Sequence, residues 1–152
     1  MIPPNEALAL YEAWSSLDKG SQAKLRRADS PDKLLGIPDF YVLASKFGWP
    51  EERYALQRMI YCLATGAITH SDDQTLTLGR ALALGKKISL MRVMQLVRQD
   101  YPNDMVQLRR MLTHAEPVLH WPTLAAQLQW WGKRERRMLI ESFVLSSPKK
   151  TV

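Results

Sequence analysis

Apolar residues recur at helical spacing along almost the whole chain, and prolines and glycines divide this pattern into short segments. One such segment lies between Pro50 and Gly66, in the order that helix starts and stops favour. Its apolar residues have the i, i+3, i+4, i+7 spacing of a single helix face: Leu56, Met59, Ile60 and Leu63. No stretch shows the alternation of a half-buried strand. The pattern therefore predicts an all-α fold, a compact helical bundle of about eight to ten helices.

The same signals predict where the helices begin and end. We expect Asn5 to cap a first helix that Gly20 ends, and Ser21 and Ser89 to cap two later helices. The helix after Ser89 is expected to bury Leu90, Val93, Met94 and Val97, and the last helix Leu139, Ile140, Phe143 and Val144. The expected helices span residues 5–18, 21–30, 38–47, 51–65, 76–84, 89–97, 104–115, 123–131 and 133–145.

The length of the chain suits a single all-helical domain, residues 1–152. Residues 67–75 are polar and lack a helical period. We expect them to form a loop between two small lobes, residues 1–66 and 76–146. The tail, residues 147–152, is expected to be frayed.

The sequence excludes several classes of protein. Cys62 is the single cysteine, so the chain forms neither an internal disulfide nor a cysteine-based zinc site. The longest stretch without Lys or Arg, residues 111–132, is interrupted by prolines, histidines and Glu116, which excludes a membrane span. The first residues lack the basic start and the apolar run of a secretion signal. We therefore expect a cytoplasmic protein that contacts no membrane and needs no cofactor.

Positive charge is concentrated in the second half of the chain. The first 75 residues contain 8 basic and 10 acidic side chains, and the remaining residues contain 13 basic and 5 acidic ones. The second half of the chain therefore supplies the positive excess that gives the net charge of +6. The basic residues form tight sets: Arg26–Arg27, Arg109–Arg110, and Lys133–Arg134 with Arg136–Arg137. A guanidinium suits bidentate phosphate contact, and each such contact releases condensed counterions. The asymmetry favours a nucleic-acid partner, although a solvated basic face gives the same composition.

The sequence shows no catalytic motif. It contains no G-x-x-x-x-G-K, G-x-G-x-x-G or G-x-S-x-G. His114 and Glu116 have the H-x-E spacing of zinc deaminases, but those enzymes also need a downstream P-C-x-x-C, which is absent. A zinc site made by His114, Glu116 and His120 would have Pro117 between its ligands, and proline breaks the helical spacing. We therefore predict neither catalytic nor metal-binding residues.

Two further hypotheses concern nucleic acid. Three tryptophans lie near basic residues in the sequence: Trp121, Trp130 and Trp131. Each would either stack on an unpaired base or pack in the core. Residues 89–114 also have the pattern helix, four-residue turn, helix. This pattern fits a free-standing helix-turn-helix DNA-binding regulator with Arg109 and Arg110 on its second helix. Such a regulator would dimerise and discriminate strongly between DNA sequences.

Longer motifs carry a resemblance to a known family. Residues 104–122 read DMVQLRRMLTHAEPVLHWP, and residues 130–136 read WWGKRER. Shorter matches extend into the first part of the chain, including LYEAW at 10–14, FGW at 47–49 and LGRAL at 78–82. The matches cover almost the whole chain. The sequence resembles the small subunit of the type I-E CRISPR surveillance complex called Cascade, the CasB family.

This resemblance implies a non-catalytic, all-helical subunit that acts in antiviral defence. Its implied partners are the repeated backbone subunits, the large subunit, a second copy of itself, the guide RNA and the target DNA. The basic surface would bind nucleic acid non-specifically and stabilise the R-loop, chiefly by contacts to the displaced DNA strand. A separate nuclease would cut the target.

The resemblance also ranks the basic residues. The implied main phosphate contacts are Arg109, Arg110, Lys133, Arg134, Arg136 and Arg137. Arg26 and Arg27 come second, and Arg80, Arg92 and Arg98 come third. For each residue the alternative is a subunit contact or a surface ion pair, for example with Glu135 or Glu141 on the last helix.

Overall fold

The computed structural model describes residues 1–147, and it confirms the predicted all-α fold. Residues 148–152 of the tail that we expected to be frayed lie outside the described residues. The elements are α1 (Pro4–Ser16), α2 (Lys19–Arg26), η1 (Pro31–Gly36), α3 (Pro38–Ala44), η2 (Ser45–Phe47), α4 (Arg53–Leu63), β1 (Thr69–His70), α5 (Leu78–Gly85), α6 (Leu90–Val97), α7 (Asn103–Ala115), β2 (Val118–Leu119), α8 (Trp121–Leu128) and α9 (Lys133–Ser146). The η elements are short 3-10 helices. No helix among residues 1–147 is both long and apolar enough to cross a membrane.

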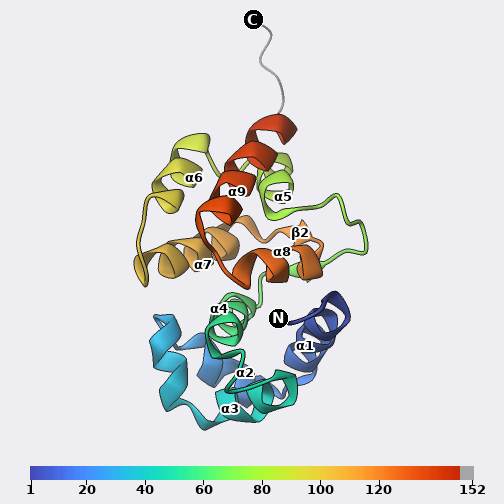
Figure 1. The fold of residues 1–152 in the computed structure, drawn as a ribbon, viewed down its shortest axis with the longest axis vertical. Coiled ribbons are helices and arrows are strands. Elements are labelled where there is room, and N and C mark those ends of the chain that lie inside the picture. The colour runs from blue at the N-terminus through green and yellow to red at the C-terminus, as the bar shows by residue number, and fades with distance from the viewer. Residues whose placement is uncertain (148–152) are drawn as a thin grey trace, which may run out of the picture.

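The helices form two halves that share one hydrophobic core. Helices α1 to α4 make up one half and α5 to α9 the other (Figure 1). Across the boundary, α1 packs on α8, and α4 packs on α7 and α8. Trp121 is fully buried at this boundary, and its indole N–H donates to the backbone oxygen of Ala7 at 2.9 Å. We call this boundary the seam.

Two helix starts differ from the prediction. Helix α1 begins at Pro4, so Pro3 occupies the cap position, and Asn5 lies inside the helix and does not cap it. Helix α2 begins at Lys19, and Asp18 caps it by accepting the N–H of Ser21 at 2.6 Å. That hydrogen bond lowers the pKa of the Asp18 carboxyl. A carboxylate at the positive end of a helix is favoured, so Asp18 takes the cap and Gly20 lies within the helix.

Other local predictions are confirmed. Ser89 caps α6 by accepting the N–H of Arg92 at 3.2 Å. All members of the α4 stripe are buried: Leu56, Met59, Ile60 and Leu63. Cys62 is fully buried beside this stripe, and burial raises the pKa of its thiol to about 12.

The stripes predicted for α6 and α9 are only partly correct. Val93 is buried, but Leu90 is exposed and Leu96 is buried in its place. In α9, Leu139 and Phe143 are buried, whereas Val144 is exposed. Both exposed residues lie next to helix ends, where neighbouring elements no longer cover the predicted face.

A short parallel strand pair was not predicted. β1 and β2 pair Thr69 with Val118 and His70 with Leu119. Flanking hydrogen bonds run from Ser71 N–H to the Leu119 oxygen at 2.8 Å and from Thr69 N–H to the Pro117 oxygen at 3.0 Å. Two residues are too few to show an alternating pattern, so the sequence carries no signal for this pair. The pairing ties the expected loop, residues 67–75, to the segment before α8.

Gly79 of α5 lies directly against the backbone of α9. A Cβ atom added there would lie 2.7 Å from the backbone nitrogen of Phe143 and 2.8 Å from the backbone oxygen of Leu139. Backbone atoms of a packed helix cannot move away cheaply. Glycine is therefore required at this position by the contact between the two helices.

We expect Gly79→Ala to lower the free energy of unfolding by about 2 kcal/mol, because the added methyl group overpacks the α5–α9 contact. Urea denaturation of the full chain measures this change. Gly85→Ala is the matched control, since a Cβ at Gly85 meets nothing within 4 Å. Equal stabilities of the two variants would contradict this account of the contact.

Candidate nucleic-acid interface

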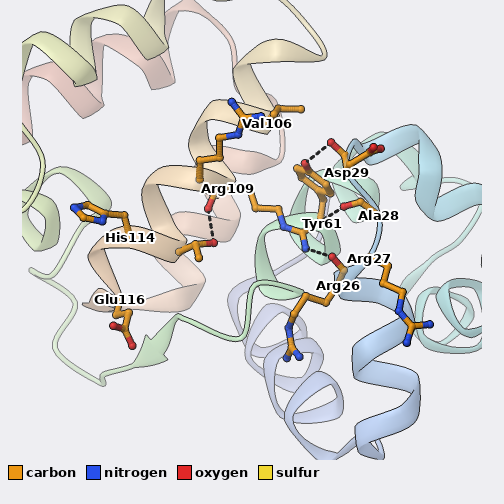
Figure 2. Close-up of a pocket in the computed structure, with 11 residues that line it drawn as sticks. Arg26, Arg27, Ala28, Asp29, Tyr61, Val106, Arg109, His114 and Glu116 are labelled. Carbon is orange, nitrogen blue, oxygen red and sulfur yellow. Dashed lines mark hydrogen bonds between the residues drawn. The ribbon is translucent and has the colours of Figure 1, made fainter.

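Two of the predicted arginine pairs meet across an open groove at the seam. Arg26 and Arg27 lie at the C-terminal end of α2, and Arg109 and Arg110 lie on α7. All four line the groove, whose volume is about 670 Å³. Figure 2 shows α7 on one side of the groove and the end of α2 on the other. The structure therefore brings together residues that are more than 80 positions apart.

Arg109 joins the two sides of the groove by hydrogen bonds. Its guanidinium donates to the backbone oxygen of Ala28 at 2.6 Å and to that of Arg26 (Figure 2). It also lies 4.5 Å from the ring centroid of Tyr61, a cation–π contact. The Tyr61 hydroxyl in turn donates to the Asp29 oxygen at 3.1 Å. Arg109 thus binds the carbonyls at the C-terminal end of α2, where a helix favours a cation.

Arg26, Arg27 and Arg110 differ from Arg109, because their side chains are exposed. Within residues 1–147 none of the three guanidinium groups makes a hydrogen bond or an ion pair. In Figure 2, Arg26 and Arg27 extend away from the Arg109 guanidinium. Their donors remain available to an anion.

A second basic cluster lies on α9. Lys133, Arg134 and Arg137 are exposed and have no partner within the described residues. None of them lines the groove. The structure therefore separates the predicted phosphate contacts into a groove at the seam and an exposed face of α9.

Arg136 belongs to neither surface. It donates to the backbone oxygens of Val97 and Gln99 at 2.9 and 2.7 Å, and it forms an ion pair of 2.9 Å with Asp104. Asp104 is only 4% exposed, and burial raises the pKa of its carboxyl, while Met105 N–H and Arg136 oppose that rise. Arg136 thus ties α9 to the end of α6 and to the start of α7.

The third group of predicted contacts is scattered. Arg80 and Arg92 are half-buried on α5 and α6, and Arg98 is exposed after α6. The Nε atom of Arg80 is buried without a hydrogen-bond partner in the described part of the chain. None of the three lines the groove.

The histidine and carboxylate candidates do not form a metal site. His114 and Glu116 line the groove, and Glu116 ends α7 with a left-handed backbone. His120 instead follows β2 in the sequence, and its Nδ1 atom forms a hydrogen bond of 2.7 Å with the Thr123 hydroxyl. Among residues 1–147, no group of three or more His, Cys, Asp or Glu side chains is placed to hold a metal ion.

No sequence pattern predicted the long-range contacts that Tyr61 and Arg58 make. Arg58 donates to the backbone oxygens of Leu128 and Gln129, both at 2.6 Å, and so binds the end of α8. Burial lowers the pKa of its guanidinium. Both residues lie on the predicted α4 helix, but their partners are more than 30 positions away, so no local pattern identifies these contacts.

We expect Arg136→Met to lower the free energy of unfolding by about 3 kcal/mol at pH 7, because it leaves the buried Asp104 carboxylate unpaired. A carboxyl whose folded pKa is raised contributes stability at low pH and loses it as pH rises through that pKa. The loss should therefore shrink at pH 4. Urea denaturation at both pH values measures it. Arg137→Met, at an exposed neighbour, should change stability by less than about 0.5 kcal/mol. Equal losses for the two variants would contradict the assignment.

This chain is similar to known proteins in sequence and in fold. The family model described as CRISPR-associated protein Cse2 matches residues 21–142. The chain is 53% identical over 153 residues to the CRISPR system Cascade subunit CasB of Escherichia coli strain K12, covering 95% of this chain and 96% of that protein. A chain in the crystal structure of E. coli Cascade bound to a PAM-containing dsDNA target matches with a TM-score of 0.92 and 52% identity over 97% of each chain. The resemblance inferred from the sequence is confirmed: the chain is similar to the Cascade subunit CasB over almost its whole length, and it belongs to the Cse2 family of CRISPR-associated proteins.

Proposed function

We propose that this protein is the non-catalytic small subunit of a type I-E CRISPR surveillance complex, which binds nucleic acid without reading its sequence and stabilises the R-loop. The observation that carries the proposal is the groove at the seam, where Arg26, Arg27 and Arg110 are exposed and have no partner within residues 1–147. The exposed cations of α9 extend the basic surface. The proposed site of action is the cytoplasm.

The proposed partners are those of a complex assembled on a guide RNA. They are the repeated backbone subunits, the large subunit, a second copy of this chain, the guide RNA and the target DNA, especially its displaced strand. The E. coli chain of 52% identity comes from a Cascade structure bound to a dsDNA target, which supports the same setting for this protein.

Weak contacts are sufficient for this task. Forming an R-loop exchanges a DNA duplex for an RNA–DNA heteroduplex of similar stability, so a few backbone contacts to the displaced strand shift the balance. Base pairing with the guide supplies the sequence specificity, and exposed Arg and Lys supply contacts to phosphate. The groove holds guanidinium groups of this kind.

The free-standing helix-turn-helix regulator is less well supported. In that class, the N-terminal residues of the second helix contact base edges. Here α7 begins with Asn103 and the buried Asp104, which is paired with Arg136, and its apolar face is buried: Met105, Leu108, Met111 and Leu112. Arg109, which that hypothesis places on the DNA, donates to backbone oxygens of the other half.

We expect the triple variant Arg26→Ala/Arg27→Ala/Arg110→Ala to shorten the lifetime of the R-loop in the assembled complex. Each lost contact to a single strand should reduce the slope of log affinity against log salt by about 0.7, so three contacts should reduce it by about 2. Dissociation rates of the complex from target DNA at several salt concentrations measure both effects.

The matched control is Lys19→Ala/Lys46→Ala/Lys87→Ala, which removes the same charge from exposed positions outside the groove. The control should leave the salt slope near that of the native chain. Equal changes in the two triple variants would show that net charge, and not the groove, determines the affinity.

A tagged copy purified from its native cells should recover a multi-subunit particle that contains short guide RNAs of uniform length. Mass spectrometry and RNA sequencing identify the components. Recovery of the protein alone, followed by tight binding to one DNA sequence, would favour the regulator and contradict the proposal.

A further inference from the structure

A second concavity lies at the seam, away from the basic groove, and aromatic side chains surround it. Its volume is about 340 Å³, and Tyr54, Tyr101, Trp130 and Trp131 contribute to its walls. Tyr54 and Trp130 are 68% and 67% exposed, and Tyr101 is 49% exposed. Large aromatic rings left open to solvent around one hollow mark a binding site more often than a structural one.

Trp131, one of the lining residues, has a buried hydrogen-bond donor without a partner. Trp131 is only 4% exposed, and its Nε1–H has no acceptor within residues 1–147. Buried polar groups are normally paired, and leaving a donor without an acceptor costs about 1–3 kcal/mol. An occupant whose acceptor, such as a carbonyl oxygen, reached this atom would remove this cost.

The remaining polar groups of the pocket fix its shape. Tyr101 donates its hydroxyl to Asp32 at 2.9 Å, which joins the two halves at the rim. Arg136 is paired with Asp104, and Arg58 binds backbone oxygens of the α8 end. The lining thus holds two cations and two carboxylates, so the pocket carries little net charge and suits a neutral group.

Helix α4 connects the pocket to the basic groove. Tyr54, Arg58 and Tyr61 follow one face of α4, and Tyr54 lines the pocket while Tyr61 lines the groove. Seven residues of α-helix span ~10 Å, so the two sites are within reach of one short segment of single-stranded nucleic acid.

We propose that this pocket binds one unpaired nucleobase of a single strand whose phosphates contact the basic surface. Trp130 and Tyr54 supply the faces for stacking, and the Trp131 indole N–H donates to a carbonyl oxygen of the base. A nucleobase is flat, neutral and rich in acceptors, which matches all three properties of the pocket. An apolar side chain from a protein partner would leave the indole N–H unpaired, so the nucleobase is favoured. The inference rests on the nucleic-acid role proposed above.

The test compares two probes that have the same phosphate charge. Fluorescence anisotropy measures binding of the full chain to labelled dT20 and to an abasic 20-mer that has no bases. We expect Trp130→Ala to weaken binding of dT20 about tenfold, the effect of losing one stacked base, and to leave binding of the abasic strand unchanged. Trp130→Phe should retain most of the affinity, because phenylalanine still offers an aromatic face.

Met91→Ala on α6 is the matched control, since Met91 is 70% exposed and does not line the pocket. It should leave both affinities unchanged. Three results would overturn the inference: no binding of dT20 by the native chain, equal affinities of the native chain and Trp130→Ala for dT20, or equal losses for the two probes. If Trp130→Ala instead released the chain from the assembled complex with dT20 binding intact, the pocket would be a subunit contact.

These results are separable from failure of the proposed function. The R-loop lifetime of the triple groove variant tests that function without involving the pocket. A shortened lifetime together with unchanged dT20 binding by Trp130→Ala would retain the function and reject the base pocket.

Discussion

The fold depends on guanidinium groups that bind the backbone oxygens at helix C-terminal ends. Arg109 binds the end of α2, Arg58 the end of α8, and Arg136 the end of α6. The last carbonyls of a helix have no intrahelical donor and lie at the negative end of the helix dipole. Each of these guanidinium groups binds the last carbonyl of a helix and one carbonyl just beyond the helix end. Arg109 and Arg58 thus pair the helix ends that meet at the seam, and Arg136 pairs a helix end within the second half.

This use of arginine divides two of the basic clusters, those on α7 and α9, between structure and surface. Arg109 and Arg136 bind the interior, while their neighbours Arg110 and Arg137 are exposed. Adjacent residues on a helix point about 100° apart, so one can bind the interior while its neighbour is exposed. One member fixes where the helix lies, and the other is presented to solvent from that fixed position. The backbone of such a surface is already in place, and ordering each exposed arginine side chain on phosphate costs about 0.5–1.5 kcal/mol.

Local signals predicted the helices well, but they could not assign the arginines. The stripe on α4 and the Ser89 cap depend on residues within two helical turns, and both are confirmed. The choice between Arg109 and Arg110 depends on the Ala28 carbonyl, 81 positions away, for which the sequence has no pattern. The same reason explains the missed β1–β2 pair, whose strands come from distant segments. Leu90 shows a further limit of periodicity. Its helix was predicted correctly, but the Leu90 side chain is exposed because no neighbouring element covers that part of the predicted face.

The position of α4 links the two candidate binding sites physically. Its Tyr61 ring lies against the Arg109 guanidinium in the groove, and its Arg58 fixes the α8 end that leads into Trp130 and Trp131. A shift of α4 along its axis would displace both contacts together, because a helix moves as a rigid element. The core around α4 opposes such a shift, since Leu56, Met59 and Ile60 are fully buried. The spacing of groove and pocket is therefore a property of the packed core, and a strand that occupies both sites meets a surface that is already in place.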